Sequence, residues 1–153
     1  MPNTYTQIHL QVVFAVKYRL ALISSEWENR LYQYVTGVVR KLGHKLLVIN
    51  GMPDHLHLLV GLKPDQALSD LMRIVKGESS EWINKMKFTK GVFRWQEGYG
   101  AFSYSKDDLP AICKYIENQK QHHAKVGFLD EYETLLNEFE IEYNTGYIFK
   151  EPA

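Results

Sequence analysis

Near the start of the chain, every second residue is apolar. Even positions from 8 to 16 are all apolar, namely Ile8, Leu10, Val12, Phe14 and Val16. The polar residues of the same stretch occupy odd positions, namely Gln7, His9, Gln11 and Lys17. A period of two is that of a β-strand, whose successive side chains point to opposite faces. The pattern therefore predicts a strand with one buried face, which needs further strands beside it to be stable.

The segments that follow have either helical or strand periodicity. The first helical segment comes after Ser25 and Glu28, which are spaced as a capping box. The two strands after it are joined by the turn-forming residues 50–54. The predicted segments are a helix over 27–42, strands over 45–50 and 55–60, a helix over 68–86, a β region over 93–105, and helices after Asp108 and over 128–139.

The order strand, helix, strand, strand, helix, strand is that of a split β-α-β unit. It predicts an α+β, ferredoxin-like fold, with an antiparallel sheet, helices on one face and additional C-terminal helices. A length of 153 residues with 45% hydrophobic content suits one domain with a proper core. We therefore expect residues 1–153 to form a single domain that ends in an acidic helix and tail over about 127–153.

Two features bear on where the protein resides. The longest apolar run, 12–16, is far shorter than the roughly 20 residues of a membrane-spanning helix, and the first residues lack the order of a signal peptide. Cys113 is the one cysteine, so an intrachain disulfide is excluded, and we interpret it as a helix packing residue. The sequence predicts a soluble, cytoplasmic protein with no membrane partner.

The formal net charge is zero, which at first argues against a nucleic-acid partner. The charges are unevenly distributed, however. Residues 1–126 hold 17 Lys and Arg against 11 Asp and Glu, whereas residues 127–153 hold 1 against 7. The larger part of the chain is thus basic enough to face DNA, although an acidic tail that is only a solvated helix agrees equally well with the counts.

A histidine pair stands in the predicted strand 55–60. Alternation places His55 and His57 on one face and the neighbouring leucines on the other. Two imidazoles at this spacing are close enough to bind one divalent ion. By itself the pair is more often a surface or hydrogen-bonded pair than a metal site.

Tyr115 and Gln119 are one helical turn apart and share a face of the predicted third helix, which His122 continues. Taken alone, Tyr115 is best explained as a tyrosine at the edge of the core with its hydroxyl in water. A phenol is a poor nucleophile at its ordinary pKa of about 10, and a metal ion can assist it by polarising a phosphoryl oxygen. The histidine pair and the helical tyrosine together supply the two parts of such a site, which are a place for a metal ion and a nucleophile.

Four ordered motifs carry a family resemblance that runs nearly from end to end. They are FAVKYR at 14–19, MPDHLH at 52–57, WQEGYGAFS at 95–103 and YIENQ at 115–119. With them the chain resembles the HUH single-tyrosine transposases, of the insertion-sequence-200-like and REP-associated kind. The resemblance implies that His55, His57 and Gln119 bind Mg²⁺ or Mn²⁺. It also implies that Tyr115 attacks a phosphodiester of single-stranded DNA, leaving a 5′-phosphotyrosine link and a free 3′-hydroxyl.

The resemblance further implies the partners, which are single-stranded DNA with hairpins and a second subunit in a homodimer with composite active sites. The basic residues that we nominate for DNA binding are Lys17, Arg19, Arg94 and Lys120, each of which is also well explained as an ordinary solvated charge. Stacking on unpaired bases is an alternative role for Trp95, Tyr99, Phe102 and Tyr104, although packing in the core or in a dimer explains most of them better.

Three rival functions stay open. An HUH-type nickase of replication or transfer is disfavoured because Asn118 stands where those enzymes usually have a lysine. A domesticated single-stranded DNA hairpin-binding protein without cutting activity is disfavoured by the intact His55, His57, Tyr115 and Gln119. A zinc hydrolase is least favoured, because no third ligand follows at a familiar hydrolase spacing.

Overall fold

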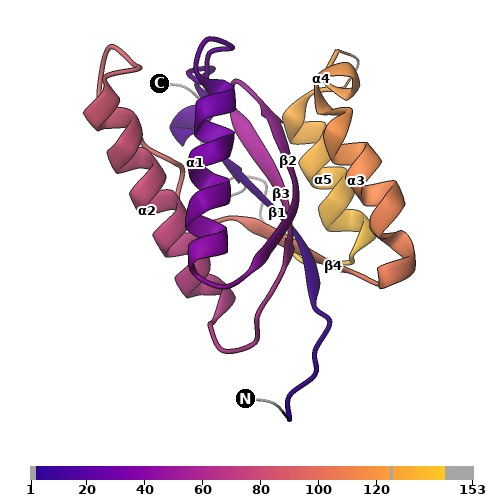
Figure 1. Ribbon diagram of the computed structural model, residues 1–153. Helices are drawn as coiled ribbons and strands as arrows, with labels where there is room; N and C mark the ends of the chain where they lie inside the picture. The colour runs from indigo at the N-terminus through magenta and orange to yellow at the C-terminus, as the bar shows by residue number, and fades with distance from the viewer. Residues whose placement is uncertain (1–2, 125, 144–153) are drawn as a thin grey trace.

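The computed structural model describes residues 3–124 and 126–143 and shows a sheet between two layers of helices (Figure 1). The strands are β1 (His9–Ala15), β2 (Lys45–Met52), β3 (His55–Gly61) and β4 (Gly100–Tyr104). The helices are α1 (Glu28–Lys41), α2 (Leu68–Met86), α3 (Leu109–Glu117), α4 (Gln119–His122) and α5 (Phe128–Glu138), with short 3₁₀ turns at Lys17–Arg19 and Lys106–Asp108.

All strand pairings are antiparallel, and the sheet order is β2-β3-β1-β4. β2 and β3 form a hairpin around Pro53 and Asp54, and α1 and α2 make the two longer connections. This is the arrangement of a split β-α-β unit, so the predicted ferredoxin-like fold is confirmed. The β region predicted over 93–105 is a strand only from Gly100, preceded by an isolated bridge between Trp95 and Val16.

Helices α1 and α2 cover the first face of the sheet (Figure 1). Even-numbered residues of β1 and β3 point to this face, in keeping with the alternation of the sequence. Its core is formed by Val12, Phe14, Leu56, Leu58 and Val60 of the sheet, Leu31, Val35 and Val39 of α1, and Leu71, Met72 and Val75 of α2. Each such side chain contributes roughly 1.5–3 kcal/mol by leaving water.

The C-terminal helices cover the second face, which contains the odd-numbered residues of β1 (Figure 1). The prediction that β1 has one buried face was wrong, because Gln11 and Val13 are both fully buried. Phe128, Tyr132, Leu135 and Leu136 of α5 pack there against Val13, Ala15 and Phe102. This second layer encloses polar side chains that the sheet would otherwise expose to water.

Two predicted helix starts differ in detail. The residue before α1 is Trp27, and it is Ser24, not Ser25, whose hydroxyl accepts a backbone N–H, from Glu26 at 3.1 Å. Asp108 does precede α3, but its side chain accepts a hydrogen bond from Ser105 and does not cap the helix. A serine or aspartate near a helix start thus has several competing partners.

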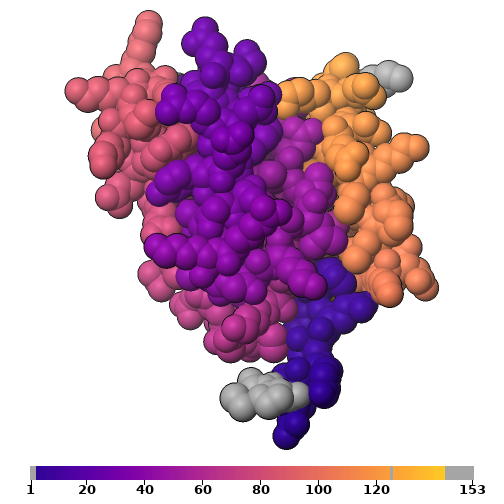
Figure 2. Space-filling view, viewed as in Figure 1, coloured from indigo at the N-terminus to yellow at the C-terminus, as the bar shows by residue number. Residues whose placement is uncertain are grey.

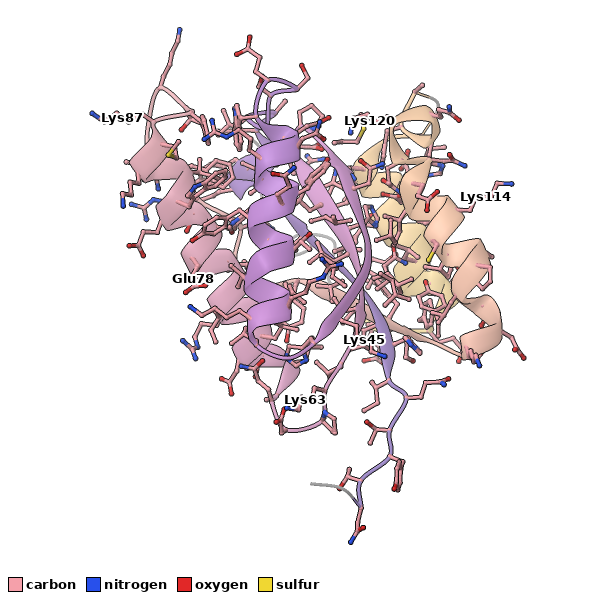
Figure 3. The ribbon with its side chains drawn as sticks, in the orientation of Figure 1. Lys45, Lys63, Glu78, Lys87, Lys114 and Lys120 are labelled. Atoms are coloured by element: carbon pink, nitrogen blue, oxygen red, sulfur yellow. The ribbon has the colours of Figure 1, made fainter. Side chains whose placement is uncertain are left out.

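Charged side chains lie on the outside of this sandwich, as Lys63, Glu78 and Lys114 show in Figure 3. In the space-filling view, α1 and the C-terminal helices flank the surface contributed by β2 (Figure 2). Among the described residues, no helix has the length and apolar content to cross a membrane. The predicted acidic tail beyond residue 143 lies outside the described residues.

Candidate functional site

Strand β3 places the histidine pair as its alternation predicts. His55 and His57 point to the second face of the sheet, and neither side chain has any exposed surface. Leu56 and Leu58 point to the opposite face and join the core under α1 and α2. The apolar residues therefore anchor the strand, and the imidazoles face the C-terminal helices.

Each imidazole is oriented through its Nδ1 atom. His55 Nδ1 lies 2.7 Å from Asp54 Oδ1, and His57 Nδ1 lies 2.7 Å from Gln11 Oε1. Gln11 is itself fixed, because its amide nitrogen donates to the Tyr104 hydroxyl at 2.9 Å. Nδ1 bonds of this kind are how proteins orient metal-binding histidines and leave Nε2 free.

Helix α3 brings Tyr115 to the same place. The helix begins with Pro110 in its first turn, where a missing N–H costs little. Its carboxyl end is held by Asn50 of β2, which donates to the backbone oxygens of Ile116 and Glu117 at 3.1 and 3.0 Å. The half-buried Tyr115 ring then lies edge-on to the His57 ring, with 6.0 Å between centroids.

The helix predicted to carry both Tyr115 and Gln119 is interrupted at Asn118, and Gln119 begins α4. The side chains of Tyr115 and Gln119 still point toward the same place, beside the histidine pair. Gln119 is fully buried, with its Oε1 3.5 Å from His55 Nε2. The four site residues predicted from the sequence thus come together within one chain.

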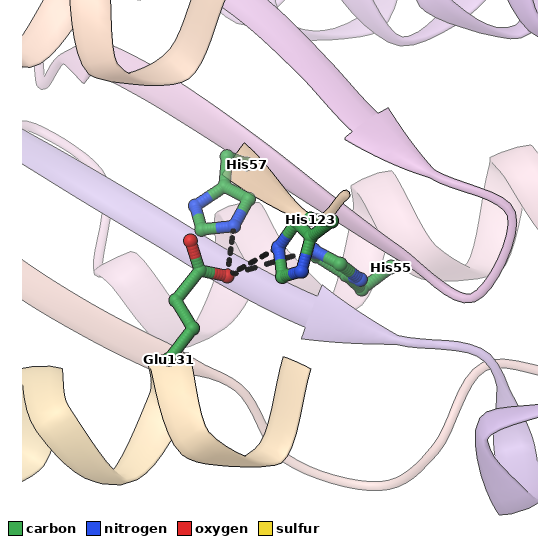
Figure 4. Close-up of side chains that lie close together, drawn as sticks. All are labelled: His55, His57, His123 and Glu131. Atoms are coloured by element: carbon green, nitrogen blue, oxygen red, sulfur yellow. Dashed lines mark hydrogen bonds and ion pairs between the residues drawn. The ribbon is translucent and has the colours of Figure 1, made fainter. Parts of the chain in front are cut away.

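Two residues that the sequence interpretation missed stand at the middle of this site (Figure 4). Glu131, in the first turn of α5, is 3% exposed, and His123 follows α4. Glu131 Oε1 lies 2.9 Å from His123 Nε2, 3.1 Å from His57 Nε2 and 3.7 Å from His55 Nε2. The other oxygen, Oε2, accepts hydrogen bonds from the Tyr115 hydroxyl and, at 2.9 Å, from Gln119 Nε2.

A signal for Glu131 was present in the sequence. It lies three residues after Phe128 and directly before Tyr132, so it belongs to the apolar stripe of α5 and not to its solvated face. A carboxylate on a buried stripe needs partners. His123 is four residues after Gln119 and so extends the face that was assigned to His122.

The pKa values of the site residues depend on burial and on the negative charge of Glu131. Burial lowers the pKa of His57 to about 4, so this imidazole is neutral at pH 7. Burial opposes the charge of Glu131, but hydrogen bonds with His123 and His57 hold the pKa of its carboxyl well below the ordinary value. Burial, and then the charge of Glu131, raise the pKa of the Tyr115 phenol.

The donor set fits a divalent cation. His55, His57, His123 and Glu131 each bring one ligand atom within 4.8 Å of the others. Imidazole nitrogens and a carboxylate oxygen are ordinary ligands of divalent ions. A cation there would offset the negative charge of Glu131 that keeps the phenol protonated.

The four basic residues nominated for DNA binding do not form one patch. Lys17 and Arg94 line one cavity of about 680 Å³ together with Trp95 and Tyr99. Arg19 ends the 3₁₀ turn after β1. Lys120 is held on the β2 side, where its Nζ donates to Asn50 Oδ1 at 3.1 Å and to Gly51 O at 3.0 Å.

Comparison with known proteins finds a family match over most of the chain. Residues 4–119 match the family model described as IS200-like transposase. The ISDra2 transposase TnpA of Deinococcus radiodurans is 29% identical over 119 residues, covering 74% of this chain and 84% of that protein. The region that matches the family model holds His55, His57, Tyr115 and Gln119 and ends before His123 and Glu131.

Two solved structures share the fold. A Deinococcus radiodurans protein assigned as a transposase superposes with a TM-score of 0.62 at 24% identity, covering 76% of this chain and 94% of its own. A REP-associated tyrosine transposase bound to a REP hairpin superposes with a TM-score of 0.62 at 15% identity, covering 99% of this chain and 92% of its own. At these identities the likeness concerns the fold alone.

Proposed function

This chain belongs to the family of IS200-like transposases, and on that premise we propose that it cleaves and rejoins single-stranded DNA with Tyr115 as the nucleophile. In this proposal, His55 and His57 would hold a divalent cation beside the reacting phosphate. The resemblance that first suggested these roles also implies Gln119 as a ligand, and that assignment stays a prediction.

One observation carries the proposal. The Tyr115 hydroxyl and the Nε2 atoms of the histidines contact the same carboxylate, that of Glu131. A phenol packed for stability alone has no reason to meet a histidine pair in a buried polar centre, because each buried polar group costs free energy unless it is paired. Attack by Tyr115 on a phosphodiester next to the histidine pair would explain why these groups meet.

The reaction has simple requirements. The Tyr115 oxygen attacks phosphorus and loses its proton, the bond from phosphorus to the 3′ oxygen breaks, and that oxygen takes up a proton to become a 3′-hydroxyl. The product is a 5′-phosphotyrosine, which a second 3′-hydroxyl resolves by the reverse attack. When bound, Mg²⁺ or Mn²⁺ supplies Lewis-acid polarisation of the phosphoryl oxygen. Asn50 and Gln119 hold the tyrosine helix and its surroundings in position.

The substrate in this proposal is a single strand with hairpins. The structural neighbour with a REP hairpin bound supports this choice. Lys17, Arg19, Arg94 and Lys120 stay the predicted DNA contacts. A homodimer with composite sites also stays a prediction, and Tyr115 already reaches the histidines of its own chain.

The test is covalent capture of DNA. The protein is mixed with Mg²⁺ or Mn²⁺ and candidate hairpin-bearing single strands, and a covalent adduct is sought on a denaturing gel. We expect an adduct with the wild type and none with Tyr115→Phe. Tyr5→Phe is the matched control, because Tyr5 is 89% exposed and should leave the adduct unchanged.

Two results would contradict the proposal. An adduct that persists in Tyr115→Phe would exclude this tyrosine as the nucleophile. Hairpin binding without an adduct, in the presence of either cation, would instead indicate a domesticated binding protein.

A further inference from the structure

We propose that Glu131 and His123 complete the cation site, with Glu131 Oε1 as a ligand beside three imidazoles and Oε2 as the group that holds the Tyr115 hydroxyl. The role of Oε2 rests on the proposed function, whereas the ligand set stands on its own geometry. Both residues lie outside the region that matches the family model.

The first argument concerns the histidine tautomers. All three imidazoles have Nδ1 at 2.7 Å from an oxygen, which is Asp54 Oδ1 for His55, Gln11 Oε1 for His57 and the Val126 carbonyl for His123. A carbonyl or carboxylate oxygen only accepts, so Nδ1 carries the hydrogen. Nε2 is then the ring atom that meets Glu131 Oε1, through its hydrogen when the ring is protonated and through its lone pair when a cation stands between them. A cation at this point would therefore be bound by all three imidazoles and the carboxylate oxygen.

The second argument is the spacing of the donor atoms. Octahedral ions such as Mg²⁺ hold their ligands at about 2.0–2.1 Å, which places neighbouring ligand atoms about 3 Å apart. Glu131 Oε1 lies 2.9 Å from His123 Nε2 and 3.1 Å from His57 Nε2. His55 Nε2 is 3.7 Å away, within a small side-chain adjustment.

The third argument is the division of labour between the two carboxylate oxygens. Oε1 faces the imidazoles of His55, His57 and His123, while Oε2 accepts from Tyr115 and from Gln119 Nε2 and lies 3.3 Å from His122 Nε2. Through its amide nitrogen Gln119 orients Glu131, while its Oε1, 3.5 Å from His55 Nε2, still faces the same centre. The carboxylate of Glu131 then links the Tyr115 hydroxyl to the cation and fixes the distance between the two.

The test is Mn²⁺ affinity, measured by calorimetry on the full chain without DNA. Loss of a ligand should cost more than loss of an orienting partner, for which about 10–100-fold is typical. We expect Glu131→Gln, which keeps the size but removes the charge and one acceptor oxygen, to weaken Mn²⁺ binding by about 100-fold or more. Gln119→Leu should weaken it less. Asp130→Asn is the matched control, since Asp130 is the exposed neighbouring acid on α5.

Two results would overturn the ligand assignment. One is Mn²⁺ binding by Glu131→Gln within about threefold of the wild type. The other is a larger loss of Mn²⁺ affinity with Gln119→Leu than with Glu131→Gln, which would make Gln119 and not Glu131 the stronger ligand. Far-UV circular dichroism checks that each variant is folded.

Wild-type protein gives a second test that needs no variant. Pulsed electron paramagnetic resonance of bound Mn²⁺ counts coordinated imidazoles, and three support the inference while two exclude His123. In protein with ¹³C-labelled glutamate carboxyl groups, the infrared difference spectrum between the Mn²⁺-bound and free states should contain a shifted carboxylate band. An unshifted spectrum excludes Glu131.

The two proposals fail in different ways. Tyr115-dependent adduct formation together with Glu131-independent Mn²⁺ binding would leave the proposed function intact and remove the ligand assignment. Glu131-dependent Mn²⁺ binding without any adduct would support the ligand assignment and contradict the proposed function.

Discussion

Gln11 Oε1 of β1 lies 2.7 Å from His57 Nδ1 of β3, in the middle of two paired strands. Both side chains are fully buried, and Gln11 donates on its other side to the Tyr104 hydroxyl of β4. Hydrogen bonds that link β4, β1 and β3 therefore set the tautomer of His57, a predicted metal ligand. The partner of His57 Nδ1 thus belongs to the sheet, whereas the partner of its Nε2, Glu131, belongs to α5.

Replacing Gln11 tests this orientation. Gln11→Leu keeps the approximate size but removes the acceptor for His57 Nδ1, so we expect Mn²⁺ affinity to fall about 10–100-fold. Calorimetry measures the loss. Gln33→Leu on the exposed face of α1 is the control. Equal affinities for the two variants would show that the Gln11 bond has no part in the site.

Asn50 fixes the tyrosine helix. Asn50→Ala removes its two hydrogen bonds to backbone oxygens at the end of α3 and leaves these groups less well paired. We expect the free energy of unfolding to fall by about 1–3 kcal/mol. The rate of adduct formation should fall while Mn²⁺ affinity changes little, because the histidines are untouched. Asn29→Ala at an exposed position of α1 is the control, and an unchanged adduct rate in Asn50→Ala would be evidence against this role.

Gly100 permits the close approach of α5 to the sheet. A Cβ atom at this position would lie 2.5 Å from Tyr132 Oη and 2.7 Å from Cε1 of the same ring. Gly100→Ala must therefore displace Tyr132 and, with it, the adjacent Glu131. We expect destabilisation of about 1–3 kcal/mol in chemical unfolding, together with weaker Mn²⁺ binding.

The control for Gly100 is Gly77→Ala in the middle of α2, where an added Cβ meets no atom within 4 Å. This change should stabilise the protein by about 0.5–1 kcal/mol, because alanine is the better helix former. A Gly100→Ala variant as stable as the wild type would contradict the close approach.

Tyr132 gives a prediction at alkaline pH. Burial raises its pKa from the ordinary value of 10.0 to about 12. Between these values the unfolded chain has released the proton and the folded chain has not, so stability falls as the pH rises from about 10 to about 12. The two pKa values differ by about two units, which corresponds to about 2–3 kcal/mol.

Tyr132→Phe removes this group. The free energy of unfolding of the variant should therefore fall less steeply than that of the wild type between pH 10 and 12, as chemical denaturation at a series of pH values would show. Tyr5→Phe should keep the wild-type slope, because Tyr5 is 89% exposed. If both variants have the wild-type slope, Tyr132 keeps its ordinary pKa in the folded protein.

Local patterns in the sequence were sufficient for much of the fold and for four of the six residues that meet in the site. Helix α2 has the predicted bounds, and the alternation in β3 correctly placed His55 and His57 on one face. The reason is that side-chain direction in a strand or helix depends on the period of the backbone, and this period is a property of neighbouring residues. Tyr115 and Gln119 were found by the same rule.

Tertiary structure alone decided that β1 is buried on both faces and that Glu131 and His123 belong to the site. The acidic count of residues 127–153 suggested a solvated helix or a charged tail, yet one of these carboxylates is 3% exposed between three imidazoles and a phenol. Periodicity shows which face of α5 is buried but not what it is buried against. That depends on how α5 packs on the sheet, where van der Waals contacts such as that of Tyr132 with Gly100 fix the position of Glu131.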